Sequence, residues 1–486
     1  MKTYSTRGLF LGKPEAEAEK KEMITLFEDY FNIEQAIERG AFIITGRKGA
    51  GKSAYAVWLQ EKAKNNDNLF CSLVKKNDSI LEELINMAPE HKLSTSVLFE
   101  WIILVRLTQM IIQTGQGKYN RYANAIEEFY DKNAGYININ AQEVKELYES
   151  KEFNIAPLMK EFVKLHKKSG ISSYKAPFYK MLLPLRTIIV EALKMDCYQN
   201  INFFVLFDDL DVKFKLDRDK ETLMDLIRVA RIYNTEYFSD ISAHVLLFLR
   251  DDIGDKLDGV DSDKNKIFLS YEHGINWYEH QEAIVDERNI LLRKFINHRL
   301  SLAFERLGIP YEKEDPWLTF VRENEYGKTL FKVVLDYTFY LPRDLIMIFM
   351  NLGSHTWNLP ITYENIQTLL TEYSSHKKSE IYDELCAIWE TEYVDKIFKF
   401  LKEVLSDIYE FKEEKGISYD EVLRKLEEHN LPETVFQLLL DYTLLVPVDD
   451  KGNVYFNYRE KEVFQSFEMY HYKLPAILSR YFNRRT

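Results

Sequence analysis

The chain has 486 residues, of which 46% are hydrophobic and 29% are charged. This length is enough for about two to four domains, and the composition is that of a globular protein rather than of a disordered or fibrous one. The net charge of −13 argues against a protein that coats nucleic acid along its whole surface, while a local basic patch remains compatible with it.

Cysteine usage and hydropathy predict a cytoplasmic protein without a membrane segment. The first 20 residues are charged and lack the apolar core of a signal peptide. Residues 97–112 are the most apolar stretch, but they include Glu100 and Arg106 and are too few to span a bilayer. No C-x-x-C pair occurs, which disfavours a disulfide framework or a zinc site. The three cysteines are far apart in the sequence: Cys71, Cys197 and Cys386.

The first predicted elements surround a glycine-rich motif. Residues 7–39 predict a mostly helical lead-in, and residues 42–45, Phe-Ile-Ile-Thr, are an apolar run typical of a buried strand. Residues 46–53, Gly-Arg-Lys-Gly-Ala-Gly-Lys-Ser, match the pattern G-x-x-x-x-G-K-[ST] of phosphate-binding loops. Residues 54–64 then predict a helix, so the motif has the strand–loop–helix context that it requires.

This motif predicts a nucleotide site. Its glycines allow a tight turn in which successive N–H groups converge on phosphate oxygens, helped by the dipole of the following helix. Lys52 supplies a positive charge for the β- and γ-phosphates, and the Ser53 hydroxyl is the expected ligand of Mg²⁺. The predicted nucleotide-binding residues are Gly46, Arg47, Lys48, Gly49, Ala50, Gly51, Lys52 and Ser53.

Further strands and helices alternate along the next 230 residues or so, which predicts an α/β fold with a parallel sheet covered on both faces. The predicted strands are residues 69–74, 202–207, 244–249 and, as a possible fifth, 267–270. Predicted helices cover residues 222–233 and 282–305. Between the second and third strands lies a stretch far longer than a normal crossover, residues 79–196, which we interpret as a helical insertion. Its clearest helical runs are residues 81–85, 96–113 and 156–168.

Two carboxylates follow the third predicted strand, Phe-Phe-Val-Leu-Phe at residues 203–207. A phosphate-loop enzyme needs one acid for Mg²⁺ and one to orient or deprotonate the attacking water. We predict the metal role for Asp208 and the catalytic base for Asp209. Asp211 is expected to hold a neighbouring residue or a water.

Two arginines are candidate sensors of the γ-phosphate. Arg250 ends the fourth predicted strand and points at the γ-phosphate if this strand lies next to the acidic one; the alternative is a surface ion pair with Asp251 or Asp252. Arg343 follows a proline at the start of an apolar helix, residues 345–351, and is expected to reach the nucleotide from a lid domain. The alternative for Arg343 is a surface pair with Asp344.

Together these elements resemble the AAA+/STAND superfamily of P-loop ATPases, in particular the branch similar to origin-recognition ATPases. The resemblance covers residues 10–375. Its matching segments are residues 10–17 of the lead-in, 46–53 (Walker A), 203–209 (Walker B), 246–250 (sensor 1) and 341–344 (sensor 2). It implies a five-stranded core with a helical lid, ATP between them and nucleotide-controlled assembly.

The sequence departs from this family in two respects. Asp209 stands where many members have glutamate, which implies slow hydrolysis and a switch rather than a motor. The helical insertion is also unusually large. Asn265-Lys266 is not followed by the aspartate of a guanine-specific motif, which favours ATP over GTP. Arg228 and Arg231 are weak candidates for an arginine finger.

The C-terminal residues predict a winged-helix-like domain. Residues 394–411, 418–428 and 432–442 read as three helices, and residues 444–458 read as a hairpin. The third helix contains no lysine or arginine, although such helices often bind DNA in the major groove. We therefore favour a protein-contact or autoinhibitory role over DNA binding. The basic tail is the remaining nucleic-acid candidate: Arg480, Arg484 and Arg485.

The leading hypothesis is an ATP- and Mg²⁺-dependent conformational or oligomeric switch. By family analogy such proteins serve in prokaryotic antiviral defence, DNA maintenance or stress signalling. We expect a homo-oligomer and a separate effector protein as partner. The alternatives are a DNA loader or remodeller, and a scaffold that binds ATP structurally. The expected parts are residues 1–75 and 201–305 (ATPase core), 76–200 (insertion), 306–380 (lid) and 381–486 (winged-helix-like domain).

Overall fold

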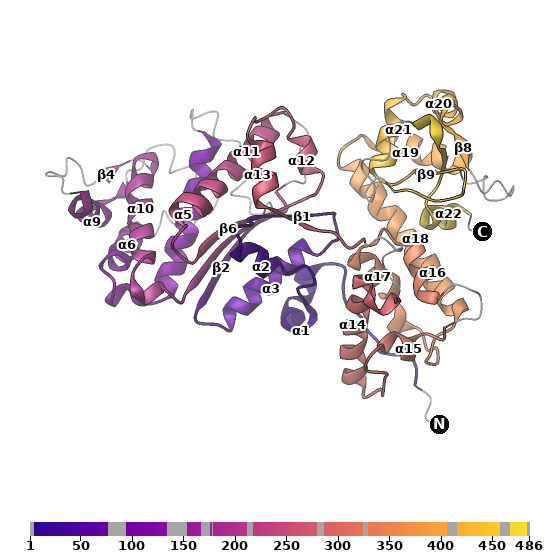
Figure 1. Ribbon diagram of the computed structural model, residues 1–486, viewed down its shortest axis with the longest axis horizontal. Coiled ribbons are helices and arrows are strands. Elements are labelled where there is room, and N and C mark those ends of the chain that lie inside the picture. The colour runs from indigo at the N-terminus through magenta and orange to yellow at the C-terminus, as the bar shows by residue number, and fades with distance from the viewer. Residues whose placement is uncertain are drawn as a thin grey trace. The chain divides into compact units, whose positions relative to one another are not determined.

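The chain folds into two compact units (Figure 1). One comprises Glu15–Asn276, and the other comprises Met1–Pro14 and Trp277–Thr486. A computed structural model describes residues 4–75, 94–133, 153–166, 175–176, 178–210, 217–278, 286–323, 329–405, 416–456 and 467–483.

A five-stranded parallel sheet forms the centre of the Glu15–Asn276 unit. Its strands are β1 (Ile43–Gly46), β2 (Leu69–Lys75), β5 (Asn202–Asp208), β6 (Ala243–Leu249) and β7 (Glu272–Ile275). Their order across the sheet is β2-β5-β6-β1-β7, and every neighbouring pair is parallel. The predicted α/β fold with a parallel sheet is confirmed at this level.

Helices cover both faces of this sheet, as Figure 1 shows. The helix α3 (Lys52–Lys64) packs on one face together with α1 (Met23–Leu26), and α5 (Thr95–Gln113) and α11 (Asp217–Ile232) pack on the other. Because both faces are covered, the central strands are apolar without alternation. In β6, for example, all seven residues except His244 are buried.

The prediction of a strand at residues 267–270 is wrong. These residues belong to a helix, α13 (Lys264–Tyr271), and the fifth strand, β7, begins directly after it. Ile267 and Phe268 are buried in the helix whereas Leu269 is 89% exposed, so the apolar run meets the core on one side of a helix only. The strand β7 pairs with β1 at the sheet edge and reads Glu-His-Gly-Ile, which carries almost no apolar signal.

The segment between β2 and β5 is mostly helical among its described residues. Its helices are α5, α6 (Arg121–Lys132), α9 (Ala156–His166) and α10 (Phe178–Leu193). A small antiparallel pair, β3 (Phe153–Asn154) with β4 (Lys175–Ala176), was not predicted. The predicted helical run at residues 81–85 lies outside the described residues.

Within the described part of the chain, α5 is the one helix long and apolar enough to cross a membrane. Of its most apolar window, 61% is buried inside the protein. Its neighbours α6, α10 and α11 and the strand β5 cover it, and Trp101, Leu104 and Leu107 are almost fully buried. These contacts are those of a core helix.

The second unit is mainly helical. Its first helices are α14 (Leu291–Leu307), α15 (Pro316–Phe320), α16 (Leu330–Asp336), α17 (Pro342–Phe349) and α18 (Tyr363–Cys386). A long helix was predicted from residue 282; α14 begins at Leu291, after a short 3-10 turn at Glu287–Asn289, and residues 279–285 lie outside the described residues. The expected boundary at residue 380 falls inside α18, which continues without a break to Cys386.

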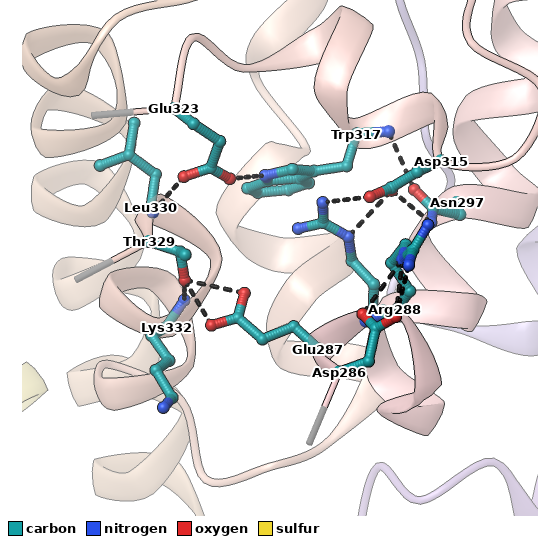
Figure 2. A network of polar contacts seen from close by, with 11 residues as sticks. Asp286, Glu287, Arg288, Asn297, Asp315, Trp317, Glu323, Thr329, Leu330 and Lys332 are labelled. Carbon is teal, nitrogen blue, oxygen red and sulfur yellow. Dashed lines mark hydrogen bonds and ion pairs between the residues drawn. The ribbon is translucent and has the colours of Figure 1, made fainter. Parts of the chain in front are cut away.

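A polar network joins α14 to α15 and α16 (Figure 2). Asp315 accepts hydrogen bonds from Arg293, with Nε–Oδ1 3.1 Å and Nη2–Oδ2 2.8 Å, and from the Asn297 amide at 2.8 Å. The Asn297 side-chain oxygen accepts from the Trp317 backbone, and the Trp317 indole donates to Glu323. Arg293 and Asp315 are each only 3% exposed, so this ion pair is buried.

The C-terminal part combines helices with a three-stranded antiparallel sheet, β8-β10-β9. The helices are α19 (Thr391–Phe400), α20 (Tyr419–Glu428), α21 (Thr434–Asp441) and α22 (Ala476–Phe482), and the strands are β8 (Ile417–Ser418), β9 (Val446–Val448) and β10 (His471–Lys473). The predicted hairpin begins at β9, where Val448 bridges Val454, and its last residues lie outside the described ones. The winged-helix assignment stays a prediction.

Candidate nucleotide-binding site

The glycine-rich loop connects the end of β1 to the start of α3. Gly49 and Gly51 have φ angles of 89° and 104°, a region that favours glycine over any residue with a side chain. Gly46 is required by a close approach instead: a Cβ there would lie 3.1 Å from the Ile275 carbonyl oxygen and 3.3 Å from the Ala50 Cβ. The backbone conformation therefore favours glycine at two of these positions, and close packing favours it at the third.

Lys52 folds back over this loop. Its ammonium donates to the carbonyl oxygens of Gly46 and Arg47, at 2.5 Å and 3.2 Å. No side chain among the described residues caps the N-terminus of α3, where Gly51 is the N-cap. Backbone N–H groups and one lysine charge thus gather at the same end of a 13-residue helix. Such an arrangement attracts anions.

Asp208 lies at the same edge of the sheet. It is the last residue of β5, is 1% exposed and takes part in a hydrogen bond with the Ser53 side chain. A single strand, β6, separates β5 from β1, so the parallel strands bring the acid and the loop together. The other oxygen of Asp208, Oδ2, is buried and has no hydrogen-bond partner among the described residues.

The environment of Asp208 disfavours its charged form. Burial is the largest effect, and together with the charge of Asp209 it raises the pKa of Asp208 from 3.8 to about 6. The Ser53 hydrogen bond and the charges of Lys75 and Lys52 oppose this shift without cancelling it. A carboxylate with such a pKa, and with an oxygen that lacks a hydrogen-bond partner, is typical of a ligand site.

Asp209 is exposed and conformationally unusual. Its side chain is 53% exposed, and its φ of 59° lies in the left-handed region that few non-glycine residues adopt. Backbone outliers of this kind gather at functional sites. Asp211 lies outside the described residues.

Two charged residues of this site were not predicted from the sequence, Lys75 and Glu17. The Lys75 ammonium is 3.8 Å from Asp208 Oδ2 and 3.8 Å from Asp209 Oδ2, and it donates a short hydrogen bond to Glu17. Burial alone would lower the pKa of Lys75, but the bond with Glu17 and the two aspartates raise it overall. The parallel register pairs Lys75 with Asp208, so the charged residue directly after the second predicted strand was the available signal.

Arg250 follows β6, which does lie next to the acidic strand β5, as its predicted role required. Its guanidinium contacts the Asp252 carboxylate, with Nε–Oδ1 3.1 Å and Nη2–Oδ2 3.2 Å. Burial would raise the pKa of Asp252, but Arg250 and Lys256 lower it overall. In this structure Arg250 thus forms the ion pair with Asp252 that was the alternative to a role as a γ-phosphate sensor.

Arg343 belongs to the unit of Trp277–Thr486 and projects from the first turn of α17. It donates to the Pro14 carbonyl at 3.3 Å and to Glu380 at 3.4 Å. The alternative pair with Asp344 is not what the structure has. Asp344 is fully buried and accepts from the Phe339 N–H and the Lys377 ammonium instead.

The weak arginine-finger candidates are occupied within their own unit. Arg228 pairs with Asp261 at 2.5 Å and with Asp225 at 3.0 Å. The hydrogen bond from the Asp263 backbone lowers the pKa of Asp261 most, burial opposes it, and the neighbouring Arg228 and Arg231 lower this pKa further.

The described residues contain no cluster of three or more His, Cys, Asp or Glu side chains that could hold a metal. The candidate metal ligands are two oxygen donors, Ser53 and Asp208, and Oδ2 of Asp208 has no hydrogen-bond partner among the described residues. Oxygen ligands and a small number of protein contacts suit Mg²⁺, which usually keeps waters and phosphates in its shell. No protein-family model matches the chain, and no curated protein sequence matches it.

Proposed function

We propose that this protein is a cytoplasmic P-loop ATPase that binds ATP with Mg²⁺, hydrolyses it slowly and acts as a nucleotide-controlled switch. One observation carries the proposal: Ser53 of the glycine-rich loop and Asp208 of the neighbouring acidic strand meet at the carboxyl edge of a parallel sheet. Ser53 and Asp208 are 155 residues apart in the sequence, and the fold brings them together.

The geometry of the loop supports a binding role for each of these groups. The N–H groups of the loop and of the α3 N-terminus would bind the phosphates, and Lys52 would exchange its two carbonyl contacts for phosphate oxygens. Ser53 and Asp208 would hold Mg²⁺, the metal neutralising charge that develops on the phosphates.

Asp209 is the proposed base. It is exposed, adjacent to Asp208, and able to accept a proton from water as that water attacks the γ-phosphorus and the bond to ADP breaks. Its short side chain and left-handed backbone support slow turnover, because the carboxylate reaches less far than a glutamate would.

The position of β6 between β1 and β5 supports membership of the AAA+/STAND superfamily, with Arg250 next to the acidic strand as a sensor. In the ATP state Arg250 would leave Asp252 for the γ-phosphate. The helices of the second unit, including α17 with Arg343, would act as the lid, and ATP would control homo-oligomer assembly and an effector partner.

Two observations favour a protein-contact role of the proposed winged-helix-like domain over DNA loading. The helix α21 contains no lysine or arginine. Arg480, the described member of the basic tail, donates to Gln367 and Thr371 of α18 at 2.5 to 2.9 Å. Its charge is therefore used inside the unit.

The test is ATP binding and turnover by the purified chain. Lys52→Ala should abolish nucleotide binding in calorimetry while the circular dichroism spectrum stays native. Lys64→Ala is the matched control, because Lys64 lies on the same helix, is 57% exposed and pairs with Glu61. Asp209→Asn should bind ATP and stop turnover.

Mass photometry with and without ATP tests the switch, and an unchanged monomer in both conditions would count against it. ATP turnover that rises with DNA, together with salt-dependent DNA binding, would support the loader instead. Normal hydrolysis by Asp209→Asn would refute the assignment of the base.

A further inference from the structure

The acidic pair already has a cation beside it. The Lys75 ammonium lies 3.8 Å from an oxygen of Asp208 and 3.8 Å from an oxygen of Asp209. The Asp208 oxygen concerned is Oδ2, the buried atom that has no hydrogen-bond partner among the described residues. Lys75 therefore faces the atom that the proposed metal would use.

A positive charge at this distance acts on metal binding in two ways. It compensates the two carboxylates when no ligand is present, and it repels a second cation that approaches them. Lys75 is 24% exposed, so water screens this repulsion only in part. A divalent ion must therefore displace Lys75 or work against it.

Glu17 offers Lys75 a second partner. The ammonium donates a short hydrogen bond to the Glu17 carboxylate, which is 48% exposed and belongs to the segment Ala16–Glu22 before the sheet begins. Lys75 can consequently move away from the aspartates and keep its charge paired with Glu17.

We propose that Lys75 is a resident cation that keeps free divalent metal away from Asp208 and Asp209 until a nucleotide brings its phosphates. This inference rests on the proposed function, in which Asp208 is the metal ligand. The added negative charge of the nucleotide outweighs the repulsion by Lys75, so the metal and the nucleotide enter together, and Lys75 moves away from the aspartates while it stays paired with Glu17.

The experiment measures Mn²⁺ binding to the full chain without nucleotide, from the electron paramagnetic resonance signal of the free ion. Lys75→Met removes the charge and keeps the length of the side chain, and it should bind Mn²⁺ roughly tenfold or more tightly than the wild type. Adding Asp208→Asn to this variant should abolish the gain. Glu17→Gln leaves Lys75 to the aspartates alone and should weaken Mn²⁺ binding. Lys64→Met is the control and should match the wild type.

Equal Mn²⁺ affinities of Lys75→Met and wild type would overturn the inference. It would also be overturned if Lys75→Met lost affinity for metal-free ATP, because Lys75 would then be a phosphate ligand. Lys75→Gln replaces the methionine variant if that one does not fold. Failure of the proposed function is separate: the wild type would then bind no ATP at all, whatever Lys75 does to the metal.

Discussion

Asp208→Asn should make the metal-free protein more stable at neutral pH. The wild-type carboxyl is 1% exposed, and its Oδ2 has no hydrogen-bond partner among the described residues. A charged group in such a place costs folding free energy unless it is paired. Asparagine has nearly the same shape, can keep a hydrogen bond with Ser53 and carries no charge.

The pKa of Asp208 sets the magnitude. Burial and the neighbouring Asp209 raise this pKa from 3.8 to about 6. The folded state therefore holds the proton more tightly than the unfolded chain, and the stability that this contributes is lost as the pH rises through about 6. At neutral pH the loss is about 3 kcal/mol, because one pKa unit corresponds to about 1.4 kcal/mol.

Thermal unfolding in EDTA, at about pH 8 and about pH 5, checks this value. At the higher pH the transition of Asp208→Asn should lie roughly 5 °C above that of the wild type, and at the lower pH this difference should fall to about half. Asp67→Asn is the control, since Asp67 is exposed in the same unit. A transition of Asp208→Asn at or below the wild type at pH 8 would refute the reasoning, as would a difference that does not depend on pH.

Three further predictions concern other parts of the two units. Gly46→Ala forces a Cβ to within 3.1 Å of the Ile275 carbonyl oxygen; we expect a loss of about 1 to 3 kcal/mol in urea unfolding and weaker ATP binding. Burial lowers the pKa of His244 to about 4. The folded state therefore resists protonation, and the protein loses about 1 to 3 kcal/mol of stability as the pH falls from about 6.5 to about 4. His244→Gln should remove this loss from the pH dependence of unfolding. Asp315→Ala leaves the buried Arg293 without its carboxylate and should cost about 3 to 5 kcal/mol in denaturant unfolding, whereas a loss below about 1 kcal/mol would mean that Arg293 finds another partner.

The candidate site was predictable where its chemistry is local in the sequence. The strand, loop and helix around residues 42–64 follow one another, so the glycine spacing and the apolar run before it specify the turn. Asp208 and Asp209 were found in the same way, because they directly end an apolar strand. The predicted start of α17 also holds, since Pro342 occupies its first turn.

Contacts between distant elements were not predictable. Lys75 meets Asp208 only because β2 and β5 pair in parallel in one particular register. Arg343 and Asp344 look like a local pair in the sequence. In the structure each contacts a residue of α18 instead, Arg343 with Glu380 and Asp344 with Lys377. The edge strand β7 was missed because half of its four residues are charged or imidazole-bearing, and its pairing with β1 needs no apolar pattern.

Other buried polar groups of the Glu15–Asn276 unit provide a comparison for the hydrogen bonding of Asp208. Asn120 is 1% exposed, yet its amide donates to the Ala192 carbonyl while its oxygen caps α6. Asn234 both donates to and accepts from the Val245 backbone in β6. Glu161 of the same unit resembles Asp208 in one respect: its buried Oε2 has no hydrogen-bond partner among the described residues and lies 3.7 Å from a cation, Arg121. At Asp208 a second unusual feature adjoins the buried oxygen, the left-handed backbone of Asp209, and both lie at the carboxyl edge of the sheet beside the loop. Such a combination next to a glycine-rich loop is expected where a ligand supplies the missing partner.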